Sequence, residues 1–180
     1  MEEKLVSSEF IFKGRAVNLR VDTVELPDGR RTTREIVEHP ECVAVIPVDG
    51  DGNILLVRQY RHAAGKSLLE IPAGGIDPGE DAEAAVRREM SEETGFSPRT
   101  VTRLGGFYSS PGFCTEYLHL YLATDLIPRR LEAEDTEGIE VVRMPVGEIT
   151  ALIDSGAIRD SKSIAGLCMY LRKNTTNTTG

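Results

Sequence analysis

The sequence predicts a mixed α/β domain preceded by a small antiparallel sheet. Residues 9–38 hold only strand-like segments around a tight turn, whereas strands and helices alternate after Pro40. The chain has 180 residues, of which 40% are hydrophobic, enough for one domain with its own core. We therefore expect an N-terminal sheet in residues 1–39, a main domain in residues 40–174 and a flexible tail in residues 175–180.

The N-terminal sheet is expected from two extended stretches, "FIFKGRAVNLRVDTVEL" and "TTREIVEH", in which apolar residues often alternate with polar ones. Pro27–Gly29 between them has the sequence "PDG", which is typical of a tight turn. A sheet this small is only marginally stable alone. We therefore expect a homodimer in which this sheet packs against the partner. The alternative is a monomer in which the sheet folds back on its own domain.

The main domain is expected to begin with a buried strand at Val43–Val48, and "ILLVRQYR" after the turn "DGDGN" is expected to be its hairpin partner. Further strands are predicted in "VTRLGGFYSS", "TEYLHLYLATDL" and "IEVVRMP". Two helices follow. The segment "PVGEITALIDSG" begins with proline and ends at Gly156, and "SKSIAGLCMYLRKN" forms the last helix.

An acidic helix is expected in the middle of the chain, from about Glu80 to Thr94. Acidic residues occupy its first turn, where the helix dipole is positive, and Gly95 provides a left-handed stop. A rotation of about 100° per residue places Glu89 and Glu93 on the apolar side of this helix. A solvated charged face would keep them off that side, because burying an ionised carboxylate is costly.

A metal site explains this pattern better than a solvated face. Glu89, Glu92 and Glu93 crowd together beside Arg88, and one arginine cannot neutralise all three. Hard divalent cations take oxygen ligands, and residues one helical turn apart can reach the same ions. The sequence therefore predicts that Mg²⁺ or Mn²⁺ binds to this helix.

The composition argues against several classes of protein. The formal net charge of −8 disfavours a nucleic-acid binder, which needs a basic face. No apolar run approaches the roughly 18–20 residues of a membrane span, and the N-terminal stretch lacks the apolar run of a signal peptide. Three cysteines without a CxxC pair indicate reduced thiols. We expect a cytoplasmic protein that binds neither nucleic acid nor membrane.

The acidic helix and the loop before it resemble the Nudix box, G-x5-E-x7-R-E-U-x-E-E-x-G-U. The matching residues are Gly74, Glu80, Arg88, Glu89, Met90, Glu92, Glu93, Gly95 and Phe96. No position departs from the pattern. The resemblance implies the Nudix fold, an α/β/α sandwich with a mixed sheet, and hydrolysis of a nucleoside diphosphate linked to another group.

The resemblance also implies roles for these residues. The metal ligands it implies are three glutamates and a backbone carbonyl, namely those of Glu89, Glu92, Glu93 and Ala73. The residues matching Glu80 and Arg88 brace the loop and orient the ligands. The bound metals would polarise the phosphates and lower the pKa of a water.

The segments around the box resemble one subfamily. Pro111 in "SSPGF" lies 15 residues beyond Phe96, and "VRQYR" and "LLEIPAG" precede the box. These features and the separate N-terminal sheet are similar to the ADP-ribose pyrophosphatase subfamily, over about Phe10 to Leu171. The resemblance implies a small-molecule substrate, ADP-ribose, cleaved to AMP and ribose 5-phosphate. It also adds weight to the homodimer, because such enzymes exchange the N-terminal region between subunits and build shared sites.

Substrate contacts follow from the same resemblance. The expected substrate-binding residues are Arg34, Glu35, Arg61, Glu70, Pro111, Gly112 and Glu116. The arginine matching Arg61 contacts phosphates, a role that suits its planar donor fork. Glu116 would lie near the terminal ribose, and the segment with Arg34 and Glu35 near the adenosine. The alternative for each charged residue is an ordinary strand or loop charge.

The general base is expected in the acidic loop "LEAEDTEGIEVV". Asp135 and Glu137 are the predicted catalytic residues, with Glu134 as the substitute if the loop rearranges. A solvated loop without a catalytic role is the alternative.

Two other functions stay open. One is a Nudix hydrolase of another nucleotide sugar or of a nucleoside triphosphate, which would share the box. The other is a non-catalytic ADP-ribose-binding sensor domain. Such domains typically lose box glutamates, whereas this sequence keeps all of them.

Overall fold

The computed structural model describes residues 2–132, 136 and 138–177. It divides the chain into two compact units. One unit combines Met1–Glu41 with Tyr108–Tyr117, and the other combines Cys42–Phe107 with Leu118–Gly180. None of the helices in the described ranges is both long and apolar enough to cross a membrane.

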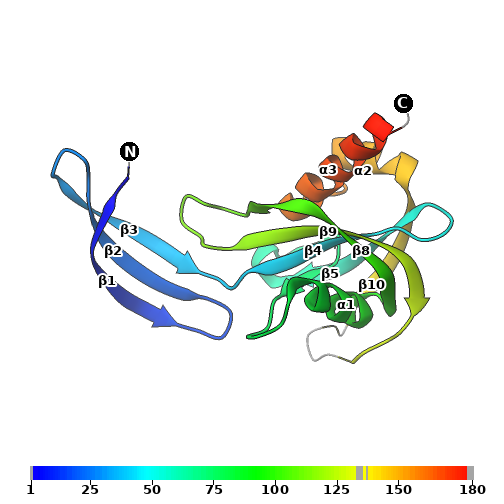
Figure 1. The fold of residues 1–180 in the computed structure, drawn as a ribbon, viewed down its shortest axis with the longest axis horizontal. Coiled ribbons are helices and arrows are strands. Elements are labelled where there is room, and N and C mark those ends of the chain that lie inside the picture. The colour runs from blue at the N-terminus through cyan, green and yellow to red at the C-terminus, as the bar shows by residue number, and fades with distance from the viewer. Residues whose placement is uncertain (1, 133–135, 137, 178–180) are drawn as a thin grey trace. The chain divides into compact units, whose positions relative to one another are not determined.

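The first unit contains the predicted antiparallel sheet, with strand order β1-β2-β3 (Figure 1). Its strands are β1 (Lys4–Lys13), β2 (Asn18–Glu25) and β3 (Arg31–Glu38). The turn between β2 and β3 is confirmed at "PDG", where Gly29 has a φ of 84° and donates its N–H to Leu26 O at 2.9 Å. β1 starts at Lys4, six residues before the predicted stretch that begins at Phe10, and all ten of its residues are exposed.

The segment Tyr108–Tyr117 is joined to the end of β3. Val37 N donates to Phe113 O at 2.7 Å, and Thr115 N donates to Val37 O at 3.0 Å. The Thr115 hydroxyl bonds the backbone N–H and carbonyl of His39, at 3.0 and 3.1 Å. These bonds explain why a segment 70 residues further along the chain groups with the N-terminal sheet.

The second unit holds two sheets, with orders β7-β4-β9-β8 and β10-β5-β6. The strands are β4 (Cys42–Pro47), β5 (Asn53–Arg61), β6 (Lys66–Glu70), β7 (Ala73–Gly75), β8 (Phe96–Tyr108), β9 (Tyr117–Pro128) and β10 (Glu140–Pro145). The helices are α1 (Ala82–Glu93), α2 (Ile149–Asp154) and α3 (Ser161–Asn177), with short 3₁₀ turns η1 (His62–Ala64) and η3 (Val146–Glu148). The short strands β6 and β7 were not expected from the sequence.

The predicted hairpin between the first two strands of this unit is wrong. β4 pairs in parallel with β9 and antiparallel with β7, whereas β5 pairs with β10 and β6. Within the described residues, the two segments pair through the isolated bridge Val48↔Ile54. All six residues of β4 are buried, so its sequence lacks the alternation that would reveal its neighbours.

Alternate residues of β4 point to opposite faces of its sheet. Val43 and Val45 pack with Val86 of α1, whereas Ala44 and Ile46 belong to the core cluster that includes residues of α3. Figure 1 shows α1 and α3 on the two sides of this sheet. The predicted α/β/α sandwich with a mixed sheet is therefore confirmed.

The two helices that flank the sheet have clear sequence determinants. Asp81 caps α1, accepting the N–H of Ala84 at 2.9 Å, and Gly95 ends it with a φ of 76°. Gly166 lets α3 approach closely, since a β-carbon there would lie 2.9 Å from a methyl group of Leu120 and 3.0 Å from one of Ile71. Of the predicted tail, residues 175–177 continue α3, and residues 178–180 lie outside the described part.

Candidate functional site

Strand β7 places its backbone against a side chain of α1. β7 pairs with β4 through Val43↔Gly74 and Ala44↔Ala73. A β-carbon on Gly74 would overlap the carboxylate of Glu89, so only glycine fits at this position. The glycine of the box thus permits close contact between a strand and a buried glutamate.

Arg88 connects the loop with the carboxylates of the helix. Its Nη2 donates to Gly75 O at 2.8 Å, and its Nε and Nη2 donate to the two oxygens of Glu80 at 3.0 and 2.9 Å. Its Nη1 donates to Glu89 at 2.6 Å and to Glu92 at 3.3 Å. Most of its donor capacity is used on Glu80 and the loop, which agrees with the bracing role implied for these two residues.

Glu80 is a fully engaged carboxylate. The hydrogen bond from Arg88 is the main reason that the pKa of Glu80 lies below its usual value. The N–H of Asp77 also donates to Glu80, at 3.1 Å. Glu80 therefore fixes the loop between Gly75 and α1 and is already supplied with positive charge.

Glu89 and Glu93 lack such compensation. Burial raises the pKa of Glu89 above its ordinary value despite the bond from Arg88. Burial, and then the charge of Glu89, raise the pKa of Glu93 to about 8. The N–H of Ala73 donates to Glu93 at 3.1 Å. Two adjacent carboxylates therefore share a site with too little positive charge.

This donor set fits a hard divalent cation. Glu89, Glu92 and Glu93 lie in the last two turns of α1, and the backbone of Ala73 contacts Glu93. Magnesium and manganese prefer such oxygen ligands. A cation of charge +2 would offset the burial that now raises the pKa values of Glu89 and Glu93.

A second group of charges surrounds Glu70 at the end of β6. Arg61 donates to both oxygens of Glu70, through Nε at 2.9 Å and Nη2 at 2.8 Å. The Glu70 side chain is only 1% exposed, whereas that of Arg61 is 40% exposed. The positive charge of Arg61 acts on the carboxylate of Glu93, and Ala73, three residues after Glu70, donates its N–H to Glu93.

The sequence analysis missed the residues that complete this group. Lys162 in the first turn of α3 bonds Glu70, and it also bonds Asp160 at 3.0 Å. The hydroxyl of Ser163 accepts the N–H of Ile71 at 2.8 Å. The contacts of Lys162 with Glu70 and of Ser163 with Ile71 each join positions 92 residues apart, and no local pattern in "DSKS" predicts them.

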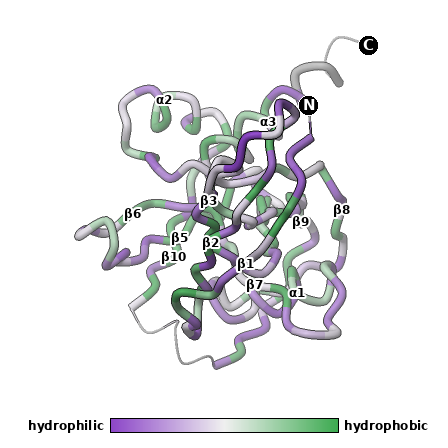
Figure 2. The backbone as a smooth tube through the Cα atoms, turned by 90° about the vertical axis from the view of Figure 1, so that its left-hand side faces the viewer, coloured by the Kyte–Doolittle hydropathy of each residue, from purple (hydrophilic) through white to green (hydrophobic). Residues whose placement is uncertain are grey.

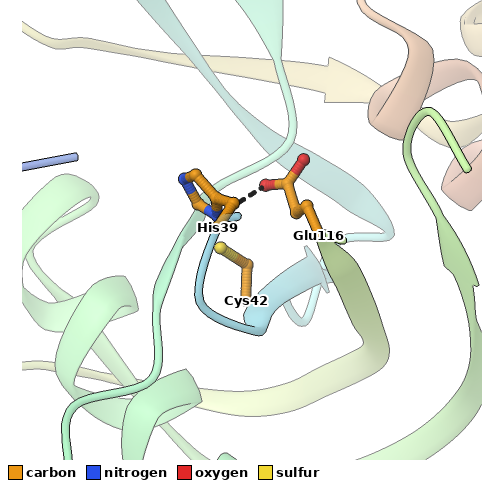
Figure 3. Close-up of side chains that lie close together, drawn as sticks. All are labelled: His39, Cys42 and Glu116. Atoms are coloured by element: carbon orange, nitrogen blue, oxygen red, sulfur yellow. Dashed lines mark ion pairs between the residues drawn. The ribbon is translucent and has the colours of Figure 1, made fainter. Parts of the chain in front are cut away.

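The other predicted substrate residues lie in the first unit. Arg34 in β3 pairs with Glu3, with Nε 3.1 Å from its carboxylate, and Glu35 is exposed on the same strand. Glu116 forms an ion pair with His39 at 3.7 Å (Figure 3). Pro111 and Gly112 are exposed in the segment bound to β3. The structure thus brings Glu116 beside the end of the N-terminal sheet.

The general base was predicted in the acidic loop between β9 and β10. Asp135, Glu137 and the substitute Glu134 lie outside the described residues. Their role remains a prediction from the sequence.

Comparisons with known proteins agree with this geometry. The NUDIX domain matches residues 38–167, and the nucleoside diphosphate sugar hydrolase N-terminal domain matches residues 3–37. A solved structure described as that of an ADP compounds hydrolase has a TM-score of 0.89, 24% identity, and coverage of 98% of this chain and 96% of that chain. This structural likeness shows the fold.

Two relatives are similar over nearly their whole length. The chain is 38% identical over 165 residues to the ADP-ribose pyrophosphatase of Bacillus subtilis (strain 168), and this alignment covers 91% of this chain and 89% of that protein. It is 41% identical over 173 residues to the methanol dehydrogenase activator of Bacillus methanolicus, and this alignment covers 95% of this chain and 93% of that protein. With its complete box and its matched NUDIX domain, this chain belongs to the Nudix hydrolase family.

Proposed function

We propose that this protein hydrolyses the diphosphate bond of ADP-ribose to AMP and ribose 5-phosphate, with Mg²⁺ or Mn²⁺ as cofactor. The observation that carries the proposal is the pair of Glu89, which is buried, and Glu93, which is half-buried. Their raised pKa values mark a site short of positive charge. A bound divalent cation would supply that charge, stabilise the phosphate oxygens in the transition state and make water a better nucleophile. Glu89, Glu92, Glu93 and the Ala73 backbone are the proposed ligands.

The other residues of the site have roles that need no cation. Arg88 and Glu80 hold the loop and keep Glu89 and Glu92 in place. Arg61 is proposed to donate hydrogen bonds to the diphosphate, because half of its guanidinium is already fixed by Glu70 and its side chain is partly exposed. The base is proposed to be Asp135 or Glu137.

ADP-ribose is the proposed substrate because of similarity in both parts of the chain. The relative from Bacillus subtilis is named for this substrate, and the N-terminal match is described by nucleoside diphosphate sugars. The name of the Bacillus methanolicus relative states a role and no reaction, so it does not select a substrate. Arg34, Glu35, Pro111, Gly112 and Glu116 are the proposed contacts to the two ends of the substrate.

A homodimer is proposed to complete the site. β1 exposes large apolar side chains, including Phe10, Ile11 and Phe12, and Figure 2 shows hydrophobic stretches along the strands of this sheet. Exposed apolar residues on one strand favour burial by another subunit. The N-terminal sheet, residues 1–39, is therefore proposed to serve assembly and substrate binding, and residues 40–174 to serve hydrolysis. The proposed location is the cytoplasm.

A substrate comparison tests the function. The protein is assayed with Mg²⁺ against ADP-ribose, other ADP-sugars, GDP-mannose, NADH and nucleoside triphosphates, and the products are separated by chromatography. We expect the highest kcat/KM for ADP-ribose, with AMP and ribose 5-phosphate as products. A higher kcat/KM for a triphosphate or NADH would refute the substrate. Binding of ADP-ribose without turnover, with Mg²⁺ and Mn²⁺ each present, would favour the sensor domain.

A further inference from the structure

We propose that the first turn of α3 is a positioning device for the site, and that Lys162 acts on substrate binding through Glu70 and Arg61 without touching the substrate. The inference rests on the proposed hydrolysis of a diphosphate substrate. It assigns a function to Asp160, Lys162 and Ser163, which lie outside the box.

Glu70 is the centre of this arrangement. Its carboxylate is almost fully buried, yet it receives two bonds from Arg61 and one from Lys162. Burial alone would raise the pKa of Glu70, but the two cations hold it below its ordinary value. Glu70 is therefore an ionised group that two positive side chains share.

Glu70 occupies only part of the hydrogen-bonding capacity of the Arg61 guanidinium. Nε and Nη2 bind Glu70, and among the described residues Nη1 has no hydrogen-bond partner. The side-on pairing fixes the plane of the guanidinium and leaves the two N–H groups of Nη1 for an incoming anion. Glu70 lies three residues before Ala73, whose N–H donates to Glu93, and the charge of Arg61 acts on the same Glu93 carboxylate.

Lys162 is the second cation bound to Glu70. Its side chain is 14% exposed, and Nζ binds Glu70 and Asp160. If Lys162 were neutral, Arg61 would be the only counter-ion of a buried carboxylate, and the resulting pair would attract a phosphate less strongly. Lys162 therefore preserves the attraction of Arg61 for the diphosphate.

The helix itself is anchored to the strand that carries Glu70. Asp160 caps α3 by accepting from Ser163 N at 2.9 Å and from Ser163 Oγ at 2.6 Å. The same hydroxyl accepts the N–H of Ile71, the residue after Glu70. Gly166 permits the close packing of α3 against Ile71. The position of α3 thus sets the position of Glu70.

The test compares Lys162→Met, which removes the charge, with Lys162→Arg, which keeps it. Lys173→Met, near the other end of the described part of α3, is the control for loss of a lysine. We expect Lys162→Met to raise the KM for ADP-ribose about tenfold while kcat stays within about threefold, because Arg61 binds ground state and transition state alike. Lys162→Arg should restore KM to within about threefold of the wild type, and Lys173→Met should match the wild type.

A double-mutant cycle identifies the route. If Lys162 acts through Arg61, Lys162→Met will change KM less than about twofold in the Arg61→Ala background. Additive effects would place Lys162 on the substrate and overturn the proposal. A lower melting temperature with unchanged KM would show a purely structural role and also overturn it. Should Lys162→Met fail to fold, Lys162→Arg decides: a tenfold rise in KM in that folded protein would contradict the charge-based role.

The anchoring is tested without any substrate. Ser163→Ala removes the acceptor of the Ile71 N–H, so hydrogen exchange at Ile71 should accelerate, and unchanged protection would contradict the anchoring by α3. The proposed function can fail separately. If the wild type prefers another nucleotide sugar, the KM comparisons are made with that substrate.

Discussion

Gly74 lies so close to Glu89 that a β-carbon at position 74 would overlap the Glu89 carboxylate. Gly74→Ala should therefore displace Glu89 from the proposed cation site and lower kcat at least about tenfold, because the ligands would no longer be aligned. Steady-state kinetics with saturating Mg²⁺ measures this effect. Gly75→Ala is the matched control, since its β-carbon would meet no atom within 4 Å. Equal kcat in both variants would contradict the importance of this contact.

Stability of the metal-free protein should fall as the pH rises. The pKa of Glu93 in the folded protein is about 8, above its ordinary value of 4.5. Its protonated form therefore favours folding, a contribution that is complete below pH about 4.5 and lost as the pH passes through about 8. We expect the Tm measured with a chelator to decrease between about pH 4.5 and pH 8. Mg²⁺ should reduce the decrease, because the cation binds the ionised form.

The contribution of Glu93 to this profile can be isolated. Glu93→Gln cannot ionise, so its Tm should fall less over the same pH range than that of the wild type. Glu83→Gln, an exposed position on the same helix, should keep the wild-type slope. Equal slopes in all three proteins would show that Glu93 does not titrate in this range.

Mixing of two impaired proteins tests the proposed shared site. The double variant Arg34→Ala/Glu35→Ala lacks the proposed adenosine contacts, and Glu93→Gln lacks a proposed metal ligand. If the N-terminal sheet serves the partner's site, a mixed dimer will contain one site without either change. We expect activity to return after subunit exchange, and light scattering to show a dimer of the 19.8 kDa chain. A monomer at micromolar concentration would refute the dimer. Confirmed exchange without activity would refute only the sharing.

The sequence was most informative where the spacing of residues along a helix also predicts which of them are buried. The positions of Glu89 and Glu93 on the apolar side of their helix predicted two carboxylates in an unfavourable environment. The structure shows Glu89 buried and both pKa values raised. The stop at Gly95 followed equally from local chemistry, because a left-handed residue ends a helix wherever it occurs.

Sequence was least informative where distant segments meet. The apolar run of β4 is compatible with any neighbour, which is why its hairpin with β5 was wrong and its parallel pairing with β9 was missed. Lys162 was missed for the same reason, since only folding brings it to Glu70. Pro111 was singled out by its spacing, but nothing local shows that its segment binds β3.

Removal of the Glu93 carboxylate is the most direct test of the central claim, that Glu89 and Glu93 hold the divalent cation on which hydrolysis depends. Glu93→Gln keeps the shape of the side chain and removes its charge. We predict that kcat for ADP-ribose falls at least about 10²-fold, or about 2.7 kcal/mol of transition-state stabilisation. Circular dichroism should match that of the wild type, and Glu83→Gln should retain full activity. Near-normal turnover by folded Glu93→Gln protein would contradict the claim.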